Sequence, residues 1–84
     1  MNDLDYNKAI YGYIYSLWET SGLSIRGFAA IHTFEERSMR DIIKAVKEDK
    51  DYQISLPTLY KICESLNISL SQFFIEVEKW QNSN

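Results

Sequence analysis

The chain has 84 residues, of which 45% are hydrophobic and 14% aromatic, and its formal net charge is −3. This length suits a single domain, and the apolar fraction is high enough to build a core without metals or disulfides. One cysteine excludes an internal disulfide, and together with one histidine it leaves too few ligands for an ordinary metal site. Neither an export signal nor an apolar run of membrane length is recognisable, so we expect a cytoplasmic protein with no membrane contact.

The first helix is predicted over about residues 4–20, with a cap at Asp3 or Asp5 and a stop at Ser21-Gly22. One helical stripe of this segment is formed by Tyr6, Ile10, Tyr13, Ile14 and Leu17. Three further aromatic residues, Tyr11, Tyr15 and Trp18, fall largely outside that stripe. They either lie on the surface with their polar atoms in water or form a second contact surface for a partner.

Two short amphipathic helices follow between Ser24 and Lys44. The first has apolar residues at Ile25, Phe28 and Ala29, and the second repeats this helical spacing at Met39, Ile42 and Ile43. Ser24 is a cap for the first of them, and Thr33-x-x-Glu36 is a capping box that predicts the start of the second at Thr33. His32 lies between the two helices and is predicted to be a packing or surface residue.

A charged connection, residues 47–52, leads to a fourth helix that is capped by Ser55 and ended by Asn67. Its predicted buried stripe consists of Leu56, Leu59, Ile62, Cys63 and Leu66, so the thiol should be buried and inert. A fifth helix over about 70–80 opens at the capping box Ser69-x-x-Gln72, and a disordered tail is expected after it. Its surplus apolar residues are predicted to form a homodimer interface: Phe74, Val77 and Trp80.

Positive charge is concentrated in the centre of the chain. Residues 24–47 carry five cationic and three acidic side chains, 5 − 3 = +2, and the remainder carries four and nine, 4 − 9 = −5. The central segment is therefore the part best suited to face a polyanion.

The same central segment resembles the helix-turn-helix of the Cro- and lambda-repressor-like DNA-binding family. The resemblance rests on Phe28-Ala29, on Phe34 five residues after that alanine, and on Met39 and Ile42. Residues 54–74, ISLPTLYKICESLNISLSQFF, resemble the fourth and fifth helices of that family. The resemblance covers roughly residues 17–74 and implies an all-α, compact five-helix lambda-repressor-like domain over residues 1–84, with its helix-turn-helix core at 24–47.

The resemblance implies a sequence-specific, homodimeric regulator that would read the major groove of double-stranded DNA with its third helix. Arg37 would donate to guanine and Glu36 would accept from cytosine. The full set of implied DNA-binding residues is Ser24, Arg26, Glu36, Arg37, Ser38, Arg40, Asp41, Lys44, Lys47, Lys50 and Tyr52.

An alternative is a protein-interaction module, such as an antirepressor, that keeps the fold and binds a protein partner. The chain has Trp18 where the family often has a phosphate-binding Arg, Ile25 where it usually has Gln, and Thr33 where its turn usually has Gly. The family register also starts the third helix nearer Glu35 than the capping box does. No paired carboxylates or Cys–His spacing suggest catalysis, so we expect no enzyme, no catalytic residue and no cofactor.

Overall fold

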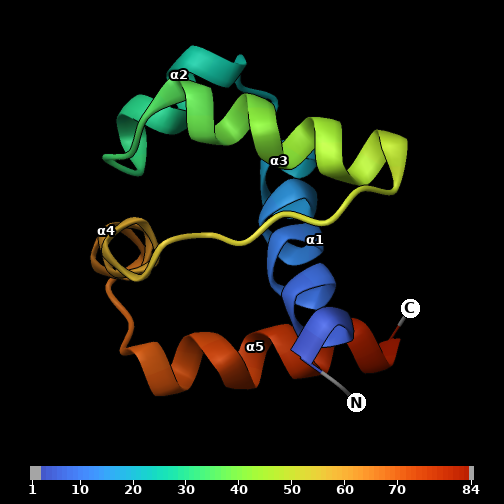
Figure 1. The fold of residues 1–84 in the computed structure, drawn as a ribbon. Helices are drawn as coiled ribbons and strands as arrows, with labels where there is room; N and C mark the ends of the chain where they lie inside the picture. Colours follow the sequence, from blue (N-terminus) through green and yellow to red (C-terminus); the bar gives the residue numbers. More distant parts are fainter. Residues whose placement is uncertain (1–2, 84) are drawn as a thin grey trace.

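Five helices account for most of the chain in the computed structural model, which describes residues 3–83, with side chains from Tyr6 onward (Figure 1). They are α1 (Asp3–Ser21), α2 (Ile25–Ile31), α3 (Glu36–Glu48), α4 (Leu56–Leu66) and α5 (Leu70–Ser83). No strand occurs within the described residues. The predicted all-α, five-helix class is therefore confirmed, while the cap predicted at Asp3 or Asp5 lies outside the described side chains.

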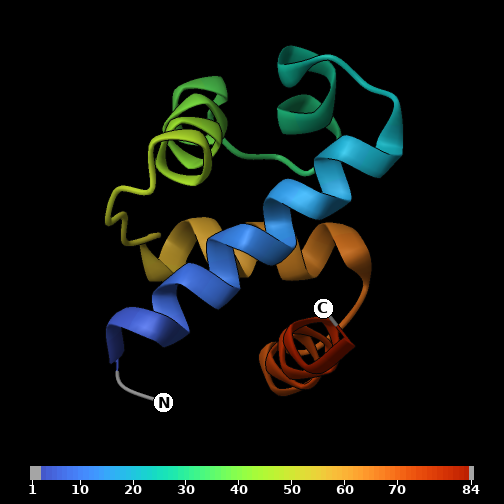
Figure 2. The ribbon, with the colours of Figure 1, turned by 90° about the vertical axis from the view of Figure 1, so that its right-hand side faces the viewer.

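The long helix α1 connects the two ends of the molecule. It packs against α2 and α3 at one end and against α5 at the other, and α4 packs on α5 (Figure 1). Figure 2 shows α1 crossing diagonally in front of α4, with α5 seen nearly along its axis. The connection between α3 and α4, residues 49–55, runs across α1 from the end of α3 (Figure 1).

All five helices contribute to one core. The side chains that are almost completely buried include Ile14 of α1, Phe28 of α2, Ile42 of α3, Ile62 of α4 and Phe73 of α5. Each helix buries an apolar stripe against the others. A helix could therefore change its orientation only by breaking contacts in the core.

The apolar residues that were predicted to join α2 and α3 are in the core. Phe28, Ala29, Phe34, Met39 and Ile42 are all buried. Phe34, in the turn, meets Phe28 edge to face at a centroid distance of 6.2 Å.

The start of α3 differs from one of the two predictions. Thr33 does not cap α3; it has a φ of 57°, in the left-handed region, and α3 begins at Glu36 with Glu35 at its N-cap position. The Thr33 amide donates to Ala30 O at 3.3 Å and the Phe34 amide donates to Ala29 O at 3.0 Å. These two bonds end α2 in a Schellman motif, which brings Phe34 back into the core. The capping-box prediction is therefore wrong, and the later start, nearer Glu35, is correct.

Replacing Thr33 by glycine should stabilise the protein by about 0.5–1 kcal/mol, because a β-branched residue is strained in the left-handed region. Thr33 is exposed, so little packing is lost. Urea denaturation measures the change in the free energy of unfolding. Asn67→Gly is the matched control: Asn67 ends α4 with a φ of 59°, a conformation that asparagine tolerates, and its substitution should have almost no effect. An equal or lower stability of Thr33→Gly would overturn the prediction: any relief of strain would then be no larger than the entropy cost of glycine and the loss of the Thr33 hydroxyl bond to His32 O.

The remaining caps agree with the sequence pattern in part. Ser24, Ser55 and Ser69 each accept a bond from the amide three residues later, at 3.0, 3.3 and 3.0 Å. The capping box at the start of α5 is only half formed, because the Gln72 side chain bonds Glu76 at 2.6 Å. The helix continues to Ser83 rather than ending near residue 80, so the tail predicted to be disordered is helical as far as it is described.

Two predicted core or interface positions are corrected by their exposure. Leu56, the first residue of α4, is 55% exposed, whereas the other four residues of its predicted stripe are buried or half-buried. Val77 is only 1% exposed and belongs to the core, so it is not available for the predicted dimer interface.

Phe74 and Trp80, the other two residues of that interface, are half-buried against α1. Phe74 packs edge to face with Tyr6 at 5.8 Å, and the Trp80 ring lies 6.1 Å from Tyr13. A Cβ at Gly12 would come within 2.9 Å of the Trp80 ring, so the glycine makes room for the indole. Much of the predicted surplus of apolar surface is therefore used within the chain.

Candidate nucleic-acid interface

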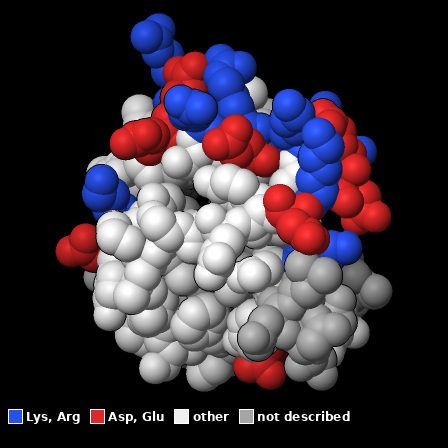
Figure 3. Space-filling view, viewed as in Figure 1, with Lys and Arg blue, Asp and Glu red and all other residues white. Residues whose placement is uncertain are grey.

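Helix α3 has one buried face and one charged face. Met39, Ile42, Ile43 and Ala45 are buried beneath it. Figure 3 shows charged side chains gathered over the end of the molecule that contains α2 and α3, while most of the remaining described surface on that side is uncharged. We call the exposed or half-exposed side of α3 its outer face; its charged residues are Glu36, Arg37, Arg40, Asp41, Lys44, Lys47 and, at the end of the helix, Glu48.

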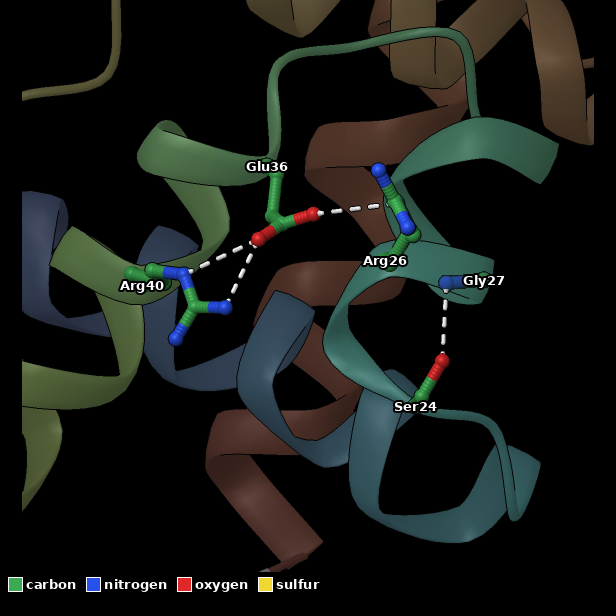
Figure 4. A network of polar contacts seen from close by, with 5 residues as sticks. All are labelled: Ser24, Arg26, Gly27, Glu36 and Arg40. Carbon is green, nitrogen blue, oxygen red and sulfur yellow. Dashed lines mark hydrogen bonds and ion pairs between the residues drawn. The ribbon is translucent and has the colours of Figure 1, made fainter.

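Glu36 is the centre of an ion-pair network at the start of this face (Figure 4). Its Oε2 accepts from Arg40 Nη2 at 2.7 Å and from Arg40 Nε at 3.1 Å, one helical turn along α3. Its Oε1 lies 3.7 Å from Nε of Arg26, which projects from α2. Both carboxylate oxygens are thus directed at arginines, so the predicted contact of Glu36 with a cytosine would require it to leave them.

Three cations on the outer face take no part in the ion-pair network of Glu36. Within the part of the chain that is described, Arg37, Lys44 and Lys47 have no ion-pair partner. All three are exposed, and they occupy the first, third and fourth turns of α3. Because the opposite side of the helix is locked in the core, these charges are carried on a rigid element.

A shallow hollow of about 230 Å³ lies on the α2 side of the outer face. Ile25 and Ile43 line it together with Arg40, Lys44, Lys47 and Glu48. The residue at the start of α2 therefore contributes an apolar surface beside the cations. Ser24, next to it, uses its side-chain oxygen to accept from the Gly27 amide at 3.0 Å, as Figure 4 shows.

The connection after α3 borders the other side of the outer face. Asp41, Lys44, Lys50 and Tyr52 are among the residues that line a second hollow of about 200 Å³ there. Burial raises the pKa of Tyr52, and the nearby Ser38 hydroxyl acts in the opposite direction. Lys50 pairs with Glu48 at 2.9 Å, and this hydrogen bond lowers the pKa of Glu48. The structure thus brings the predicted residues of α3 and the connection together along one face.

The anchoring of this connection was not foreseen from sequence. Tyr11, which was predicted to lie on the surface or at a second contact surface, is only 3% exposed and donates a hydrogen bond to Lys50 O at 2.8 Å. Both alternatives are therefore wrong for Tyr11. No local pattern signals a contact between residues 39 positions apart. Tyr15 and Trp18 are half-buried and pack on each other at 5.6 Å.

His32 and Cys63 have structural roles. The His32 ring packs on Phe28 at 4.4 Å, and its Nδ1 lies 2.7 Å from Ser65 Oγ of α4. Burial lowers the pKa of His32 and raises the pKa of the buried Cys63 thiol. The prediction of a packing histidine and a buried cysteine is confirmed.

No protein-family model, curated protein or solved structure matches the chain. Among the described residues, no three side chains of the metal-ligating types come together. None of the described helices has the length and apolarity needed to cross a membrane.

Proposed function

We propose that the protein is a sequence-specific DNA-binding transcriptional regulator that inserts α3 into the major groove, acting as a homodimer in the cytoplasm. The observation that carries this proposal is the rigid outer face with Arg37, Lys44 and Lys47 free of ion pairs among the described residues. The sequence resemblance to lambda-repressor-like domains gives the same orientation of α3. Arg37, in the first turn, is the side chain best placed for a bidentate contact with guanine.

The remaining candidate residues divide by role under this proposal. Lys44 and Lys47 would contact phosphate along the groove, and Lys50 and Tyr52 would contact the backbone beside it. Arg26 and Arg40 are held by Glu36 at exposed sites, where ion pairs are weak and exchange readily. Ser38 and Asp41 lie at the edge of the outer face nearest Tyr52.

The test is binding of duplex DNA at several salt concentrations. Three phosphate contacts per protomer in a dimer predict a slope of log K against log salt of about −5. Arg37→Ala should weaken binding to the preferred site by about 1–3 kcal/mol and relax specificity at one base pair. Lys79→Ala removes a positive charge from α5, at the other end of α1, and should leave the preference unchanged.

A protein-interaction module is the second candidate, because Leu56 and Tyr60 expose apolar surface one turn apart on α4, at 55% and 51%. Under this alternative the chain binds a protein, and duplex DNA gives neither a salt-dependent affinity nor an Arg37 effect. Absence of both responses, with a stable complex formed through α4, would replace the first proposal by the second.

A further inference from the structure

The connection between α3 and α4 is fastened to α1 at three successive points. Lys8 Nζ lies 3.4 Å from Asp49 Oδ1, the buried Tyr11 hydroxyl donates to Lys50 O at 2.8 Å, and the Tyr11 and Tyr52 rings meet edge to face at 6.5 Å. The Lys8–Asp49 pair is exposed and contributes little. Tyr11 provides two of the three contacts and is buried, whereas Lys8, which provides the third, is half-buried.

The backbone at the end of α3 is fixed as well. Asp49 has a φ of 53°, which turns the chain sharply, and the Lys50 amide donates to Ala45 O at 2.9 Å. The Lys50 residue is therefore held from both sides: its amide by α3 and its carbonyl by Tyr11. A connection without these bonds would have to be ordered when a ligand binds, at a cost in conformational entropy.

This anchoring determines what the connection presents to the outer face of α3. Lys50 and Tyr52 line the hollow of about 200 Å³ that Asp41 and Lys44 line from the α3 side. The Lys50 side chain is 61% exposed, and among the described residues its ammonium forms one ion pair, with the exposed Glu48 two positions earlier. It is therefore available to exchange that partner for a phosphate.

We propose that Tyr11 is a positioning residue for DNA binding, which holds the connection so that Lys50 and Tyr52 contact the phosphate backbone beside the groove entered by α3. This inference rests on the proposed function. Tyr11 itself touches no DNA, since it is buried beneath the connection, and it acts through the peptide of Lys50.

The experiment compares wild type, Tyr11→Phe, Lys50→Ala and the double variant in duplex binding. Tyr11→Phe removes one hydrogen bond and keeps the ring, and it should weaken binding about 3–10-fold. The salt slope should fall by about one phosphate contact per protomer. Lys50→Ala should weaken wild type by a similar factor but have less than about a twofold effect in the Tyr11→Phe background, because a mispositioned lysine has already lost its contact.

Tyr13→Phe is the matched control. It makes the same change on α1 but on the side that faces Phe73 and Trp80 of α5, and it should alter neither the affinity nor the salt slope. Hydrogen exchange without DNA provides a second measurement: the Lys50 amide, which donates to Ala45 O, should exchange faster in Tyr11→Phe, with the exchange in α2 and α3 unchanged.

The outcomes separate this inference from the proposed function. If wild type does not bind DNA, the proposed function fails and the role of Tyr11 fails with it. If wild type binds and the effects of Tyr11→Phe and Lys50→Ala are additive, DNA binding stands and the positioning role is overturned. Faster exchange throughout α2 and α3 would also overturn it, because Tyr11→Phe would then act by loosening the whole domain.

Discussion

Replacing Phe28 by alanine should cost about 3–5 kcal/mol of stability, the range measured for buried aromatic residues. Phe28 is 1% exposed and contacts both Phe34 in the turn and His32 at the end of α2. A domain of this size is stable by roughly 4–13 kcal/mol, so the loss would remove a large part of the total. Chemical denaturation followed by tryptophan fluorescence measures it.

Ile31→Ala is the control for this substitution. Ile31 lies on the same helix but is 58% exposed, so truncating it should change stability by less than about 0.5 kcal/mol. If Phe28→Ala lowered the stability as little as Ile31→Ala, the packing of Phe28 between α2 and α3 would not be what holds α3 in place. The proposed DNA-reading function would then lose its rigid support.

Replacing Glu36 by glutamine should strengthen DNA binding by about tenfold at moderate salt, because it removes a negative charge from the outer face and releases two arginines. Glutamine keeps the length of the side chain and can still accept one hydrogen bond from Arg40. Stability should change by less than about 1 kcal/mol, since the ion pairs are exposed at the surface. A salt titration should also give a steeper slope, as Arg26 and Arg40 become free for phosphate.

Glu78→Gln makes the same change of charge on α5, at the other end of the molecule, and should change DNA affinity by less than about twofold. This control separates a local effect of Glu36 from the effect of net charge. Weaker binding by Glu36→Gln would mean that the carboxylate accepts a hydrogen bond from a base directly, as the sequence resemblance implied. The two interpretations of Glu36 therefore predict opposite changes in DNA affinity for Glu36→Gln.

Periodicity, the end signals of the helices and the family resemblance together predicted the five helices correctly, and each helix carries its own apolar stripe. Ser24, Ser55 and Ser69 cap the helices that they precede, and Asn67 ends α4 in the left-handed conformation. These are local hydrogen bonds, which depend on residues three or four positions apart. Local signals of this kind can be read without knowledge of the fold.

Thr33 shows where a local signal misleads. Thr33-x-x-Glu36 satisfies the capping-box pattern, but burial of Phe34 against Phe28 requires the chain to reverse at Thr33. The tertiary contact outweighs the cap, since burying an aromatic ring stabilises by more than a capping bond. The same competition explains Val77, whose apolar side chain was assigned to a partner and is instead buried within the chain.

The candidate site was predictable in its residue types and only partly in its geometry. The excess of positive charge in residues 24–47 follows from composition, and the pair Glu36–Arg40 follows from the i,i+4 spacing within one helix. The approach of Arg26 to Glu36 across two helices, and of Tyr11 to Lys50 across 39 positions, does not. Such pairs form only after the core sets the angle between elements.

The sequence by itself therefore determined the helices, most of their ends, and which face of each is apolar. Only the tertiary structure decided which charged groups neutralise one another, which remain free on the outer face of α3, and which tyrosine holds the connection beside it. The physical reason is the distance along the sequence over which each interaction acts. Helix propensity, capping and periodic burial act over a few residues. Ion pairs and buried hydrogen bonds between elements depend on how the whole core packs.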